Sequence, residues 1–243
     1  MAEVERTDGN PDAALLALFA AISRGDRGEV VRRLDSVPGL AGRPMGVGAS
    51  RQAAAAYFLV AIRHYVYAGD TALHVAAAAH QPGIAELLVA SGADVRARNR
   101  RGAEPLHYAA DGRPGAEDWD PVAQADVVAH LCAAGADPNA VDRSGVAPLH
   151  RAVRTRSSAA VSALLRNGAD PKLMNGSGST PLHLAVQNTG RSNSGSAAAK
   201  DEQAKVIVVL LDHGASPRDA DAKGRTVAAA ACSAWIRDLL SSR

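Results

Sequence analysis

The sequence predicts an all-α protein built from layered helix pairs, and three observations support this fold class. A short stretch of the Pro-Leu-His type recurs along the chain and begins at Ala72, Pro105, Pro148 and Pro181. After each copy comes a second apolar segment with helical spacing, and then a Gly-Ala dipeptide typical of a helix end. The chain is 47% hydrophobic but only 3% aromatic. Its core must therefore consist of small aliphatic side chains, which suit closely packed helix layers.

Composition limits the classes of protein that this chain can be. The 243 residues carry a formal net charge of +2, too small to indicate nucleic-acid or membrane binding. Cys132 and Cys232 are expected to be small buried hydrophobic residues in a reducing compartment. No signal peptide and no apolar stretch long enough to cross a bilayer are recognisable, so a cytoplasmic protein without a membrane contact is expected.

The N-terminal part predicts helices before the recurring stretches begin. Asn10-Pro11-Asp12 has the residue types of a helix start, and apolar residues follow at helical spacing as far as Ile22. A second short helix is expected to end at Pro38-Gly39. Residues 39–52 are rich in Gly, Pro and Ser and indicate a loop, and an extra helix is expected over residues 53–65.

Each later unit has the same parts in the same order. A turn with glycine precedes a short helix, which opens as in Thr180-Pro181, where threonine can cap the helix and proline suits its first position. A loop and a second helix follow. The glycines that end the second helices, at 92, 135, 168 and 214, indicate a period of 33 residues with two insertions.

These matched positions and this period resemble the ankyrin repeat family. The resemblance implies an α-solenoid of stacked antiparallel helix pairs with projecting β-turns, in which each repeat contacts only its neighbours. It further implies one ankyrin-repeat domain over residues 1–243. Its parts are a divergent N-terminal repeat (12–37), a loop and extra helix (39–65), repeats at 66–98, 99–141 (insertion 113–121), 142–174 and 175–220 (insertion 189–199), and a C-terminal cap (221–240).

The four recurring histidines are expected to be structural rather than metal ligands. Equivalent positions in stacked repeats lie roughly 10 Å apart, whereas a metal needs ligands within about 2.1 Å. In the family, this histidine hydrogen-bonds to the threonine three residues earlier, and His150 is expected to break that pattern because Ala147 stands there. No catalytic or cofactor motif is present, so no enzyme activity, cofactor or metal is expected. The structural turn set is Thr71, His74, His107, His150, Thr180 and His183.

The family resemblance also places partner contacts on the turns and on the ends of the first helices. The positions that correspond here are rich in arginine, which favours a protein partner with an acidic surface and makes nucleic acid an unlikely target. A monomer is expected. The predicted partner-binding residues are Arg100, Arg101, Asp111, Trp119, Arg143, Arg151, Arg154, Arg156, Gln187, Asn188, Lys223 and Arg225.

The two insertions are expected to project from one edge and to flank Arg154 and Arg156. Trp119, in the first insertion, is either tucked onto the third repeat or an anchor for a partner. In the tucked form, Asp118 or Asp120 would pair with one of these arginines.

The function expected from the sequence is a non-enzymatic protein–protein interaction module. It would bind an acidic partner surface through its turns and inner helices. Two alternatives stay open: a small-ligand pocket or enzyme formed by the two insertion loops, and nucleic-acid binding by the arginine-rich face. The absence of aromatic residues on that face argues against stacking of single-stranded bases.

Overall fold

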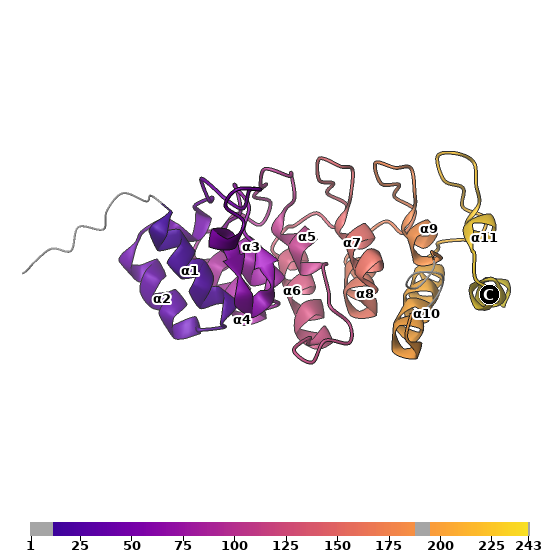
Figure 1. The fold of residues 1–243 in the computed structure, drawn as a ribbon, viewed down its shortest axis with the longest axis horizontal. Helices are drawn as coiled ribbons and strands as arrows, with labels where there is room; N and C mark the ends of the chain where they lie inside the picture. Colours follow the sequence, from indigo (N-terminus) through magenta and orange to yellow (C-terminus); the bar gives the residue numbers. More distant parts are fainter. Residues whose placement is uncertain (1–11, 188–194, 243) are drawn as a thin grey trace, which may run out of the picture.

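The computed structural model describes residues 12–187 and 195–242. Helix pairs stand side by side in chain order and form one elongated solenoid, with a row of loops projecting beyond the short helices (Figure 1). Each pair is a helix and the helix that follows it in the chain, and the first five pairs pack against each other. The pairs are α1 (Ala13–Ser23) with α2 (Arg27–Ser36), α3 (Ala72–Ala78) with α4 (Pro82–Ala90), α5 (Pro105–Ala109) with α6 (Pro121–Ala133), α7 (Pro148–Thr155) with α8 (Ser158–Arg166), α9 (Pro181–Ala185) with α10 (Ala197–Asp212), and α11 (Val227–Ala230) with α12 (Ala234–Ser241).

The core runs through the whole stack instead of gathering at one centre. Short helices pack on short helices from α3 to α9, and long helices pack on long helices from α4 to α10. The buried side chains between them are mainly Leu, Val, Ile and Ala. Small residues let these layers approach closely, which confirms the all-α solenoid expected from the composition. Within the described ranges, no helix combines the length and apolar character that a membrane span needs.

The projecting turns, called fingers here, are joined to each other through the backbone. Arg143 N–H donates to the Arg101 carbonyl at 2.9 Å, and Gly176 N–H donates to the Gly145 carbonyl at 3.1 Å. A Cβ on Gly176 would lie 2.1 Å from the Ser144 carbonyl oxygen. Only glycine therefore permits this approach, and the fingers form a continuous row.

The helix expected over residues 53–65 is wrong. This segment contains the short helical turns Ala55–Tyr57 and Val60–Ile62 and two short strands, β1 (Phe58–Leu59) and β2 (His64–Tyr65), which pair antiparallel. The chain reverses at Arg63, which has a φ of 51°. Aromatic residues such as Phe58 and Tyr65 favour strands, and the return of the chain supplies a pairing partner.

Residues 46–69 form an enlarged first finger. Met45 N–H donates to the Asp70 carbonyl at 2.8 Å, as Asn99 N–H donates to the Ala103 carbonyl at 3.1 Å in the next finger. Residues 46–69 thus occupy the place that residues 100–102 fill there. The base is held to α1, because the Asp12 carboxylate accepts the N–H groups of Gly46 and Val47 at 3.1 Å each.

The start of α1, the two cysteines and the second insertion can be compared with the remaining expectations. Asp12, rather than Asn10, stands at the start of α1, and Asn10 lies outside the described residues. Cys132 is half-buried. Cys232 was expected to be buried but is exposed, because it lies in the connection between α11 and α12. Residues 188–194 of the second expected insertion are outside the described residues, and α10 already begins at Ala197.

Candidate partner-binding surface

The recurring histidines connect each short helix to the next finger. In His74, His107 and His150 the Nδ1 atom accepts the backbone N–H three residues earlier, each at 3.1 Å. The Nε2 atoms contact carbonyl oxygens of the following repeat at 3.0–3.1 Å. Since a carbonyl only accepts, Nε2 carries the proton. His183 likewise joins Thr180 Oγ1 at 2.7 Å and the Arg225 carbonyl at 2.9 Å.

His150 lacks the threonine hydroxyl contact, as expected, but it keeps the backbone contacts of the pattern. Its Nδ1 partner is the backbone N–H of Ala147, so the missing hydroxyl at that position does not matter. Burial lowers the pKa of His74 and His150, and lowers that of His107 to about 4. These imidazoles are therefore neutral at pH 7, as an accepting Nδ1 requires.

The enlarged finger lies against the second finger and α5. The His64 ring packs edge-on against Tyr108 with ring centroids 4.8 Å apart. Arg100 Nη2 donates to the Ala49 carbonyl at 2.6 Å. The guanidinium groups of Arg100 and Arg101 lie 5.1 and 4.0 Å from the centre of the Tyr67 ring. This part of the short-helix side is thus covered by the chain's own residues.

Tyr108 anchors the enlarged finger from below, a role that the sequence analysis missed. Its hydroxyl donates to Asp70 Oδ1 at 3.0 Å and accepts from Asn99 Nδ2 at 2.8 Å. Burial and the neighbouring Asp70 raise the pKa of Tyr108, which keeps the hydroxyl protonated. The only signal in the sequence is that a tyrosine follows His107, where the other repeats have Val75, Arg151 and Leu184.

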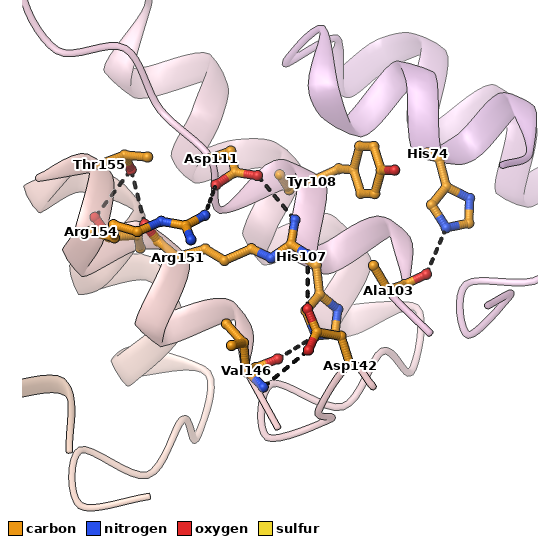
Figure 2. A network of polar contacts seen from close by, with 12 residues as sticks. His74, Ala103, His107, Tyr108, Asp111, Asp142, Val146, Arg151, Arg154 and Thr155 are labelled. Carbon is orange, nitrogen blue, oxygen red and sulfur yellow. Dashed lines mark hydrogen bonds and ion pairs between the residues drawn. The ribbon is translucent and has the colours of Figure 1, made fainter. Parts of the chain in front are cut away.

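Arg151, on α7, is the centre of an ion-pair network that joins the end of α5 to the third finger (Figure 2). Its Nη1 lies 3.1 Å from Asp111 Oδ2, and its Nη2 lies 3.0 Å from Asp142 Oδ2. The Asp142 carboxylate also accepts the backbone N–H groups of Ser144 and Val146. Burial acts to raise the pKa of Asp142, but Arg151 and these N–H groups outweigh it and lower the pKa. The Arg151 charge is therefore balanced within the molecule.

A cavity of about 630 Å³ opens between the fingers and the helices α5 and α7. The enlarged finger forms one wall through His64 and Tyr67. We call this hollow the basic cavity, because five arginines and two aspartates line it: Arg100, Arg101, Arg143, Arg151, Arg154, Asp111 and Asp142. The structure thus brings six of the predicted partner-binding residues to one place, and Asp142 joins them although it was not predicted.

Comparison with protein families decides the class of this chain. A family model described as ankyrin repeat matches residues 68–100 and 177–222, and a model described as ankyrin repeats (3 copies) matches residues 122–194. Together these matches cover more than half of the chain. The chain belongs to the ankyrin repeat family. Domains of this family are generally protein–protein interaction modules and typically lack enzymatic activity. No curated protein matches the chain.

The other predicted residues lie elsewhere on the ankyrin repeats. Arg156 and Gln187, together with Arg154, line a neighbouring hollow of about 190 Å³ between α7, α9 and α10. Lys223 and Arg225 lie on the last finger, where Arg225 Nε is 3.4 Å from Asp221. Asn188 is outside the described residues. The expected surface therefore divides into the basic cavity and more distant positions.

The loop that joins α5 to α6 does not pair with the third repeat as expected. Asp118 Oδ2 lies 2.6 Å from Arg113 Nη2, and Asp120 caps α6 by accepting the N–H groups of Val122 and Ala123. Pairing with Arg154 or Arg156 is therefore wrong. Helix α6 starts at a proline and needs a cap, and that local demand uses Asp120.

Trp119 lies half-buried on its own ankyrin repeat. Its Nε1 donates to Gln124 Oε1 at 3.0 Å. Gln124 is fully buried, accepts from Ser157 Oγ at 2.7 Å and donates to the Ala109 carbonyl at 2.9 Å. The indole also lines a cavity of about 490 Å³ between this loop and the tip of the enlarged finger. The loop and the tip of the enlarged finger thus face each other across this cavity.

No group of three or more His, Cys, Asp or Glu side chains suited to a metal ion occurs among the residues that the structure describes.

Proposed function

We propose that this ankyrin repeat protein is an interaction module that binds an acidic segment of a partner protein at the basic cavity. The observation that carries the proposal is the gathering of five arginines around one hollow in a chain whose net charge is only +2. A cavity lined by one sign of charge attracts the opposite sign and orients the partner as it approaches.

The cavity is accessible from the side that the family commonly uses for its partners. Arg101, Arg143 and Arg154 are exposed on the second finger, the third finger and α7. Arg151, in contrast, is held by two carboxylates, and Arg100 donates to the enlarged finger. The exposed three are therefore the residues proposed to meet the partner, and Arg151 and Arg100 hold the walls in place.

Affinity purification from the source cells, with partners identified by quantitative mass spectrometry, tests this function. We expect the variant R101E/R143E/R154E to lose at least nine tenths of a partner that the wild-type protein retains. The matched control R166E/R218E/R237E changes the net charge equally at exposed arginines outside the cavity and should retain that partner. Equal retention by both variants, with unchanged circular dichroism spectra, would refute the cavity as the binding site.

The proposal includes a monomeric protein that acts in the cytoplasm. The two cysteines, which are unpaired, support a reducing compartment. Sedimentation equilibrium and cell fractionation measure these two properties separately. A dimer, or a protein found only in a membrane or extracellular fraction, would contradict them.

A further inference from the structure

Three guanidinium groups at the basic cavity have no carboxylate partner at hydrogen-bonding distance. Over the described ranges 12–187 and 195–242, no ion pair forms at Arg101 or Arg143, and the contact of Arg154 with Asp111 is 3.9 Å long. The two aspartates of the cavity are already engaged by Arg151. The lining therefore has a formal excess of three positive charges that the chain does not neutralise.

The geometry points to a phosphorylated side chain of the partner as the group that fills this cavity, an inference that rests on the proposed function. A phosphate monoester carries about −1.5 to −2 charges at pH 7 and three acceptor oxygens, whereas a carboxylate carries one charge and two oxygens. Arg101, Arg143 and Arg154 come from three separate elements that all line the cavity, so they can approach different oxygens of one group. The phosphate matches both the excess charge and the number of donors.

The type of basic residue supports the same ligand. Apart from His64, every basic side chain that lines the cavity is arginine. Guanidinium donors are planar and bind phosphate oxygens in pairs, which an ammonium group does not do. Arg101 is also held over the Tyr67 ring at 4.0 Å, so part of its conformational entropy is already lost before a ligand binds.

The position of the cavity favours a side chain over a membrane surface. Residues of α5 and α7 line its floor, and residues of the fingers and of the enlarged finger line its walls. The Ser144 residue at the third finger adds a further hydroxyl to the lining. A side chain from an extended peptide can enter such a hollow, whereas the headgroup plane of a bilayer meets the finger tips first.

Fluorescence anisotropy with three peptide libraries tests the inference. The labelled nonapeptides have randomised flanks and a central phosphoserine, glutamate or serine. We expect the phosphoserine library to bind at least tenfold more tightly than the glutamate library at 150 mM salt, and the serine library to bind more weakly still. Arg143→Ala should reduce the preference for phosphoserine over glutamate below threefold. The matched change Arg166→Ala, on α8, should leave it intact.

Each other outcome decides the question. If the glutamate and phosphoserine libraries bind equally and depend on Arg143, the phosphate inference is overturned while the acidic-partner function stands. If neither library binds, both fail. If single-stranded RNA or anionic phospholipid vesicles compete at lower phosphate concentration than the phosphopeptides, the phosphate belongs to a nucleic acid or a lipid and the inference is overturned.

Discussion

His107 makes the stability of the stacked repeats depend on pH between 7.5 and 5.5. It is fully buried, and burial lowers its pKa from 6.5 to about 4. In the unfolded chain the imidazole has its usual pKa of about 6.5. Below that pH the unfolded state binds a proton that the folded state refuses, so the free energy of unfolding falls as pH falls, and the loss levels off near pH 4.

The size of the effect follows from these two pKa values. Lowering the pH from 7.5 to 5.5 should cost about 1.4 kcal/mol from this residue alone, and the complete loss at lower pH is about 3 kcal/mol. Carboxylates with ordinary pKa values contribute little above pH 5.5, whereas burial raises the pKa of Glu104, which therefore acts in the opposite direction to the histidines. His74 and His150 act in the same direction, because burial lowers their pKa as well.

Urea unfolding followed by circular dichroism at pH 7.5, 6.5 and 5.5 measures this contribution. The variant His107→Gln should be less stable at pH 7.5, because the Glu104 and Val146 hydrogen bonds are weakened, but its loss of stability on acidification should be about 1.4 kcal/mol smaller. His213→Gln, at an exposed position, serves as the control and should keep the wild-type pH dependence. A full wild-type pH dependence in His107→Gln would refute the reasoning.

Three further changes test the parts of the structure that shape the cavity. Gly48→Ala should loosen the enlarged finger, because the new Cβ would lie 2.4 Å from the backbone at 67–68. Limited proteolysis should then cut residues 46–69 several times faster than in the wild-type protein. An unchanged rate would contradict this packing. Arg151→Met should lower the free energy of unfolding by about 2 kcal/mol, since it leaves a buried carboxylate unpaired; a loss under 0.5 kcal/mol in urea unfolding would count against the network. Gln124→Leu should lower the free energy of unfolding by about 1–3 kcal/mol. In a background without the other tryptophan, it should also shift the fluorescence emission of Trp119 to the red, because the hydrogen bond of the indole is lost. Unshifted emission would show that other contacts hold the indole.

The enlarged finger gives this solenoid an uneven surface for partners. Residues 46–69 cover part of the short-helix side near α5 and provide the wall at His64 and Tyr67. The basic cavity is walled by this finger near the second repeat and extends toward α7. The enlarged finger therefore departs from the regular surface that the repeats form.

Much of the helical framework could be predicted because its signals are local. Proline at a first helical position, glycine after a helix and apolar spacing of 3.6 residues all act within one or two turns of chain. Local signals were not enough for the segment 53–65. Its apolar spacing is compatible with a helix, but its ends are fixed by the pairing of Met45 with Asp70, which lies outside the segment.

The candidate site shows the limit of such reasoning. The arginine-rich turns were recognisable from the repeat pattern, and so were the five arginines that reach the basic cavity. The repeat pattern did not show which of these arginines lack a close carboxylate partner. Arg151 is neutralised by Asp111 and Asp142, and Asp111 lies in another repeat.

The sequence by itself determined that this chain is a stack of ankyrin repeats with basic turns, since the period and the caps are properties of neighbouring residues. Tertiary structure alone decided that residues 46–69 fold over Tyr108 and close one side of a cavity. The physical reason is that ion pairs, ring contacts and backbone pairing between distant segments depend on distances in space, and the repeat pattern specifies those distances only where no insertion interrupts it.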